Sequence, residues 1–159
     1  MPIEICEYKA EDVDDTVKQL WLSLAREMFK IEHFILPSEA NADKWIKFIR
    51  DSLAGKKSFL FVAKRGNKPI GFAHGSVLRE YPLEVSEFAG TINDLYVSPE
   101  FRGKGIGKKL VFESLNRLKA EGVKVVRLMV VIENMSAVKL YEKFGFKIYQ
   151  YGMMKVLRQ

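Results

Sequence analysis

The chain has 159 residues, of which 48% are hydrophobic and 29% are charged. This length and balance suit one globular domain with a sizeable core, so we expect a single domain over residues 1–159. The 26 lysines and arginines exceed the 20 aspartates and glutamates, which gives a formal charge of +6. That charge favours an anionic partner, but it is too scattered to indicate a nucleic-acid-binding protein.

Cysteine content and the first residues bear on the compartment. A single cysteine, Cys6, excludes an internal disulfide framework and a zinc site built from several thiolates, and it favours a reducing environment. The opening MPIEICEYKAED lacks a basic, apolar leader, and no apolar run approaches the roughly 18 residues of a membrane span. We therefore expect a soluble cytoplasmic protein that binds neither nucleic acid nor membrane.

The first third of the chain alternates strand and helix patterns. The alternation of apolar and charged residues over Ile3–Glu7 indicates a strand, and apolar residues at helical spacing predict a helix from Asp14 to about Phe29. An apolar, aperiodic loop is expected over Ile31–Pro37. Helical spacing returns over Asn41–Leu53.

Strands dominate the middle of the chain. The β-rich runs Ser58–Lys64 and Pro69–Leu78 are separated by Arg65-Gly66-Asn67-Lys68, which is typical of a hairpin. The polar segment Arg79–Ala89 reads as a connection. Thr91–Val97 then predicts a further strand.

The last third begins with a helix and continues as strand, helix and strand. The first helix ends at Gly122, and the nearly continuous apolar run Val123–Ile132 predicts a strand. A short helix is expected over Asn134–Phe144. One or two closing strands are expected over Phe146–Leu157.

A basic, glycine-rich loop separates the Thr91–Val97 strand from the helix that follows it. Gly103, Gly105 and Gly107 remove side chains from the turn, so successive backbone N–H groups can converge on an anion at the positive end of the helix. The P-loop pattern fails because lysine is followed by lysine, and the dinucleotide pattern fails because position 108 is lysine rather than glycine. The loop therefore indicates a phosphate cradle of another type, with a flexible turn as the plain alternative.

Two motifs carry a resemblance to a known family. Arg102, Gly105 and Gly107 form the pattern Arg-x-x-Gly-x-Gly directly after a strand, and the sequence here resembles the GNAT superfamily of acetyl-CoA-dependent N-acetyltransferases. The segment Glu133–Phe146 resembles the family's second pattern, Asn-x-x-Ala-x-x-x-Tyr-x-x-x-Gly-Phe. The motifs cover about the C-terminal half, and the order of elements agrees over the whole chain.

The resemblance implies a fold and a cosubstrate. The fold would be α/β (α+β), with a mixed, mostly antiparallel central sheet splayed near Val97 and Val131 and helices on both faces. Acetyl-CoA would bind without a metal, its pyrophosphate in the glycine loop and its pantetheine arm along the strand edge. The N–H of Val97 would stabilise the oxyanion when an amine attacks directly. The implied cofactor-binding residues are Leu95, Tyr96, Val97, Arg102, Gly103, Lys104, Gly105, Ile106, Gly107, Lys108 and Asn134.

The resemblance also implies roles in the transfer step. Tyr141 occupies the family's general-acid position, where its phenol would protonate the departing thiolate. Asn134 matches the residue that hydrogen-bonds the cofactor arm or an ordered water. The plain alternatives are a core aromatic for Tyr141 and a helix N-cap for Asn134.

The general base is the least defined role. An alkylamine has a pKa of about 10, so a base or a water chain should help it to attack at neutral pH. Asp94 is a candidate on the motif strand, although side-chain alternation leaves open which face it occupies. His33 and His74 lie outside both motifs, lack metal-ligand spacing and are expected to be solvated or hydrogen-bonded. Further candidates in the connection before the strand are Glu80, Glu84 and Glu87.

The acceptor amine is open from the sequence. A protein N-terminal or lysine amine is the first expectation, and a polyamine or antibiotic-like amine is the alternative. A non-catalytic acyl-CoA sensor would keep the glycine loop but need no proton donor. The apolar loop Ile31–Pro37 is expected either to form a wall of the acceptor site or to close the core, and it is also a possible homodimer contact.

Overall fold

The computed structural model describes residues 1–78 and 88–157. The chain falls into two units, one over Met1–Met129 and one that begins at Val130. The larger unit contains the sheet, three of the helices and the glycine loop. No helix among the described residues is long and apolar enough to cross a membrane.

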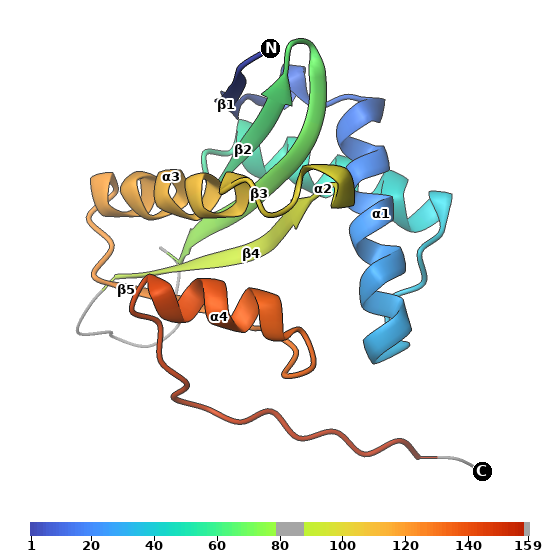
Figure 1. The fold of residues 1–159 in the computed structure, drawn as a ribbon, viewed down its shortest axis with the longest axis vertical. Coiled ribbons are helices and arrows are strands. Elements are labelled where there is room, and N and C mark those ends of the chain that lie inside the picture. Colours follow the sequence, from blue (N-terminus) through green and yellow to red (C-terminus); the bar gives the residue numbers. More distant parts are fainter. Residues whose placement is uncertain (79–87, 158–159) are drawn as a thin grey trace. The chain divides into compact units, whose positions relative to one another are not determined.

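The larger unit is built on a five-stranded sheet in the order β1-β2-β3-β4-β5 (Figure 1). The pairs β1–β2, β2–β3 and β3–β4 are antiparallel, and β5 pairs with β4 in parallel. This confirms the mixed, mostly antiparallel sheet. The strands are β1 (Ile3–Tyr8), β2 (Ser58–Arg65), β3 (Lys68–Leu78), β4 (Ala89–Val97) and β5 (Val125–Leu128).

Helices cover both faces of this sheet, as the resemblance implied. A hydrophobic core lies between one face and the helices α1 (Asp15–Glu32) and α2 (Glu39–Ala54), where Leu60 and Val62 of β2 pack among the helix side chains. The helix α3 (Ile106–Ala120) crosses the opposite face (Figure 1). Successive strand residues face opposite sides, and this alternation divides the strand side chains between the two layers.

Local sequence explains where the first two helices begin. Asp14 precedes α1, and its carboxylate accepts hydrogen bonds from the backbone N–H groups of Thr16 and Val17. Ser38 caps α2 in the same way, through the N–H of Asn41. These caps replace the intrahelical partners that the first N–H groups of any helix lack. The described part of this unit also contains two short 3₁₀ turns, η1 (Ala10–Asp12) and η2 (Pro99–Phe101).

A β-bulge in β4 lies directly after the end of its pairing with β5. Asp94 pairs with His74, whereas Ile92 pairs with Gly75, so Asn93 is an extra residue with no partner in β3. A bulge bends its strand and increases the local twist. The ladder between β4 and β5 ends at Ile92, directly before the bulge. Within the described residues, the rest of β4 has a strand neighbour on one side only, which is the splay expected near Val97.

The predicted strand Val123–Ile132 is wrong in its length, because only Val125–Leu128 forms a strand. Val123 is instead buried in the turn after α3, where its N–H donates to the carbonyl of Leu118. After Leu128 no ladder partner is present among the described residues. Apolar composition alone therefore overestimated the length of the strand, since the ends of a strand are defined by its ladder hydrogen bonds and not by its composition.

Within the described residues, the smaller unit contains one helix, α4 (Met135–Lys143). The closing strands predicted over Phe146–Leu157 are wrong, since the described residues contain no strand there. Residues 147–157 are exposed and make no backbone ladder within the part of the chain that the structure describes. Their alternating apolar pattern suits a strand, but a strand forms only when another strand accepts its hydrogen bonds.

Candidate functional site

The glycine loop joins β4 to α3 through two left-handed residues. Gly103 has a φ of 74° and Gly105 a φ of 76°, and a Cβ at either position would meet no atom within 4 Å. Space is therefore not the reason for glycine here. The backbone conformation is the reason, because side chains disfavour positive φ.

The loop presents unpaired backbone donors. From Gly103 to Lys108, no N–H group donates to an acceptor within the described residues. Several of these groups belong to the first turn of α3, where the helix dipole also favours negative charge. A run of such donors at a helix N-terminus is an anion-binding arrangement, and it agrees with the phosphate cradle predicted from the glycines.

Arg102 is held by protein groups. Its Nε donates to the carbonyl of Val97 at 2.8 Å, and its Nη2 lies 2.8 Å and 2.9 Å from the two carboxylate oxygens of Glu27 in α1. The guanidinium also lies over the Tyr96 ring, 5.5 Å from its centroid. These contacts tie the start of the loop to the end of β4 and to α1.

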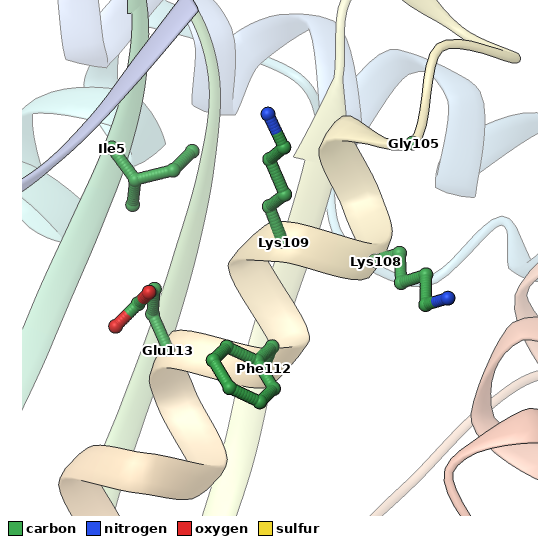
Figure 2. A pocket seen from close by; sticks show the side chains of 6 residues that line it. All are labelled: Ile5, Gly105, Lys108, Lys109, Phe112 and Glu113. Carbon is green, nitrogen blue, oxygen red and sulfur yellow. The ribbon is translucent and has the colours of Figure 1, made fainter.

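The lysines of the loop differ in their surroundings. Lys104 lies over the Phe101 ring and donates to the carbonyl of Glu100 at 3.3 Å. Lys108 and Lys109 point in different directions from the first turns of α3 (Figure 2). Both line an open hollow of about 520 Å³ that adjoins the loop at Gly105. The residues that line this hollow are Ile5, Gly105, Lys108, Lys109, Phe112 and Glu113.

The last residues of β4 contribute backbone to the site. Tyr96 points its side chain into the core beside α1 and α2, where it is 5% exposed. Burial raises the pKa of the Tyr96 phenol, although a hydrogen bond with Ser23 acts in the opposite direction. The unpaired edge after the bulge leaves main-chain groups for an extended ligand to pair with, as an added strand would.

Asp94 is the predicted base candidate, and it faces the side of the sheet covered by α1 and α2. Its Oδ2 lies 3.3 Å from Nδ1 of His74, and its side chain is 23% exposed. The amide nitrogen of Asn93 lies 3.4 Å from the same Nδ1. The bulge therefore places a carboxylate, an imidazole and an amide together. They lie beside the open segment of β4, which is the part after Asn93 that has a strand neighbour on one side only within the described residues.

These side chains belong to a polar band on one face of the sheet. Asn93 donates to Ser76 at 3.2 Å, and the hydroxyl of Ser76 lies 2.9 Å from that of Thr91. Ser58 lies opposite Ser76 in the ladder between β2 and β3. The band consists of Ser58, His74, Ser76, Thr91, Asn93 and Asp94.

The second motif lies in the smaller unit. Asn134 is the N-cap of α4, and its Oδ1 accepts from the N–H of Ala137 at 3.3 Å and from the hydroxyl of Ser136 at 3.3 Å. Tyr141 is buried against Phe146, with the ring centroids 5.7 Å apart. The capping and packing alternatives are therefore confirmed for these two residues, and their ligand-binding and catalytic roles stay predictions.

The motifs and the donor-lined loop agree with a comparison of the whole sequence. The model of the acetyltransferase (GNAT) family matches residues 19–146. The chain belongs to this family. Its members are acyltransferases, and the match spans both motifs.

Individual relatives support the same family. An uncharacterized N-acetyltransferase of Methanocaldococcus jannaschii is 34% identical over 87 residues, which cover 55% of this chain and 38% of that protein. The spermidine N(1)-acetyltransferase of Thermoplasma acidophilum is 28% identical over 154 residues, which cover 93% of this chain and 90% of that protein. The chain thus spans well under half of the first relative and most of the second.

The fold agrees with solved GNAT structures. An aminoglycoside acetyltransferase from an uncultured soil metagenomic sample superposes with a TM-score of 0.72 at 19% identity, covering 98% of this chain and 97% of that one. GNAT acetyltransferases use acetyl-CoA, and the unpaired amides of the loop fit its pyrophosphate. No group of three or more His, Cys, Asp or Glu residues that could hold a metal is present in the described part of this GNAT chain.

Some expectations for the site had a different outcome. His74 is neither solvated nor fully hydrogen-bonded, because it is 2% exposed and its Nε2 has no partner among the described residues. Its place on the same face as Phe72 and Ser76 follows from strand alternation, but nothing in the sequence aligned it with Asp94. In the Ile31–Pro37 segment, Phe34 is 79% exposed and so does not close the core. Three base candidates, Glu80, Glu84 and Glu87, lie outside the described residues.

Proposed function

We propose that the chain transfers an acetyl group from acetyl-CoA to a primary amine of a small aliphatic polyamine. The observation that carries the proposal is the continuity of the open β4 edge with the loop Gly103–Lys108, whose N–H groups have no acceptor in the described residues. The N–H groups of the loop suit a pyrophosphate, and the open edge of β4 suits an extended chain of amides. Coenzyme A combines the two.

In this proposal the residues of the loop hold the cosubstrate in different ways. The N–H groups of Gly103–Lys108 would bind the pyrophosphate, with Lys104 and Lys108 adding positive charge. Arg102 would act through position, because its contacts with Val97 and Glu27 fix the loop. The N–H groups of β4 after Asn93 would bind the arm and the acyl oxygen.

Two side chains would move the protons of the reaction. Bound acetyl-CoA would supply the acetyl group as a thioester, whose C–S bond breaks as the C–N bond to the amine forms. Asp94 would accept at its carboxylate the proton that the attacking nitrogen loses, and would then release it to solvent. Tyr141, in the role that its motif implies, would donate its phenolic proton to the sulfur and regain a proton from solvent.

A small cationic acceptor is better supported than a protein. A relative that matches nearly the whole chain is named a spermidine acetyltransferase. Phe48 of α2 is 58% exposed, and its ring packs beside His74, the neighbour of Asp94. An aromatic face near a carboxylate suits an alkylammonium chain. The protein amine expected first from the sequence gains no such support.

The proposal also covers the domain organisation, the cellular location and the role of the apolar segment Ile31–Pro37. The family match over residues 19–146 includes parts of both units, which supports one acetyltransferase domain over residues 1–159. A cytoplasmic location suits a consumer of acetyl-CoA. The exposed apolar side chains of Phe34, Ile35 and Leu36 support an acceptor wall or a homodimer contact.

An amine panel tests the proposal. Release of thiol from acetyl-CoA is followed with spermidine, an aminoglycoside and a lysine-containing peptide, and the products are identified by mass spectrometry. We expect spermidine to give the highest kcat/KM and a product heavier by one acetyl group. Turnover with the peptide alone would contradict the polyamine assignment. Binding of acetyl-CoA without turnover of any amine would favour a sensor.

A further inference from the structure

His74 is a rigidly held imidazole that neither motif contains. It lies in the middle of β3, directly opposite Asp94 of β4, and is 2% exposed. The Phe48 ring packs edge-on against it, with centroids 6.3 Å apart and an interplanar angle of 85°. A buried ring on a central strand loses its rotational freedom, so its nitrogen atoms have fixed directions.

The neighbours of Nδ1 decide whether this ring nitrogen carries a proton. Nδ1 lies 3.3 Å from Oδ2 of Asp94 and 3.4 Å from the amide nitrogen of Asn93. A carboxylate only accepts and an amide NH₂ only donates, so Nδ1 satisfies one neighbour at a time. Asn93 already has an acceptor in Ser76, and a hydrogen bond to a charged carboxylate is the stronger one. Nδ1 therefore carries the proton and donates it to Asp94.

The other ring nitrogen shows that this arrangement has a cost. Nε2 is buried and has no hydrogen-bond partner within the described residues. An unsatisfied polar group in the interior destabilises a fold, so an apolar side chain of similar size would be the stable choice at this position. A histidine whose Nε2 lacks a partner among the described residues, and whose Nδ1 faces the proposed base, points to a role in the reaction.

We propose that His74 is a positioning residue, which holds the Asp94 carboxylate so that its second oxygen faces the amine on the open segment of β4. This inference rests on the proposed acetyl transfer. The imidazole does not touch the substrate in this role. It donates from Nδ1 to Oδ2, and the proton leaving the amine goes to Oδ1 of Asp94.

Two variants of His74 separate positioning from structure. His74→Leu removes the donor and the unpaired Nε2, so we expect kcat for spermidine to fall by about tenfold or more while the midpoint of thermal unfolding stays equal or rises. The KM for spermidine and the Kd of acetyl-CoA should change by less than about twofold. His74→Asn places an amide donor near the position of Nδ1 and should restore most of kcat.

A double-mutant cycle with Asp94→Asn shows whether His74 acts through that carboxylate. In the Asp94→Asn background, His74→Leu should change kcat little further, because the group that it positions has been removed. Thr91→Val is the matched control, since it removes the Ser76–Thr91 contact in the same band and leaves His74 and Asp94 paired. Its kcat should equal that of the wild type.

Several results would overturn the inference. An unchanged kcat in His74→Leu, fully additive effects in the cycle, or a loss of kcat that follows a lower unfolding midpoint and is not restored by asparagine would each do so. Failure of the proposed function is seen separately. In that case the wild-type protein itself would acetylate no amine of the panel.

Discussion

At the scale of single residues, the left-handed glycines of the loop are the most specific feature of the site. Alanine at position 105 would disfavour the observed φ of 76° by about 1–2 kcal/mol. An exposed loop relaxes when it is empty and must regain the conformation on binding. We therefore expect Gly105→Ala to raise the Kd of acetyl-CoA by about tenfold, measured by isothermal titration calorimetry.

Gly122 provides the matched control for this variant. It has a φ of 81°, and a Cβ there would also meet no atom within 4 Å, but it follows the other end of α3. Gly122→Ala should lower the free energy of unfolding by a similar amount and leave the Kd unchanged. Equal Kd values for Gly105→Ala and the wild type would show that the loop does not hold the anion.

Sequence and structure agree best on residues whose roles are local. The turn at the glycine loop and the capping alternative for Asn134 depend on neighbours a few positions away, and the structure contains both. Phosphate binding by the loop stays a prediction. The partner of Arg102 is Glu27, 75 positions earlier in the chain, and no local pattern indicates it. The pair of His74 and Asp94 depends on the register of two strands and on a bulge, which composition does not determine.

At the scale of elements, the start of α1 has a stability that depends on pH. Asp14 accepts hydrogen bonds from the N–H groups of Thr16 and Val17 at 2.9 Å and 3.3 Å. Burial alone would raise the pKa of Asp14, but the hydrogen bonds from Thr16 and Val17 outweigh it and hold the pKa below its ordinary value. Since the folded-state pKa is the lower one, the stabilisation is present above about pH 4 and is lost as the pH falls through the folded-state pKa.

Asp14→Ala should therefore lower the free energy of unfolding by about 1 kcal/mol at pH 7. The difference from the wild type should shrink at an acidic pH below the folded-state pKa, where the carboxylate is protonated. Urea denaturation at the two pH values measures both numbers. Asp14→Ser, which keeps a capping oxygen without a titratable group, is the control. A difference that is the same at both pH values would contradict the capping account.

The bulge at Asn93 is the element that separates the site from a regular sheet. Deleting Asn93 would let Asp94 follow Ile92 directly, which restores a regular ladder with β3 and keeps each remaining side chain on its face. We expect the deletion variant to fold with an unchanged or higher unfolding midpoint. Because the end of β4 would then keep the direction of a regular strand instead of the bend at the bulge, acetyl-CoA binding should be lost. Wild-type binding by the deletion variant would show that the bulge is not needed.

Element prediction from the sequence succeeded where pairing is local. The Arg65–Lys68 turn joins β2 and β3 as expected, and Gly66 has the positive φ that such turns favour. The run Val123–Ile132 and the segment Phe146–Leu157 failed for the opposite reason. Their patterns report the affinity of side chains for a sheet, whereas strand formation also requires a neighbour with free backbone groups.

At the scale of the whole molecule, part of the positive charge behind the formal charge of +6 lies beside the glycine loop of the larger unit. Lys104 and Lys108 flank backbone donors that have no acceptor among the described residues. The charge excess that first suggested only an anionic partner thus accompanies a specific anion-binding arrangement. The family match connects this arrangement to acetyl transfer.

Calorimetric titration of the full chain with acetyl-CoA tests the central claim, that the loop Gly103–Lys108 and the open edge of β4 together hold this cosubstrate. The account predicts saturable binding with one site per chain, and weaker binding as the salt concentration rises, because phosphates are bound in part by lysines near the surface. Absence of binding by both acetyl-CoA and CoA to the folded protein would contradict it.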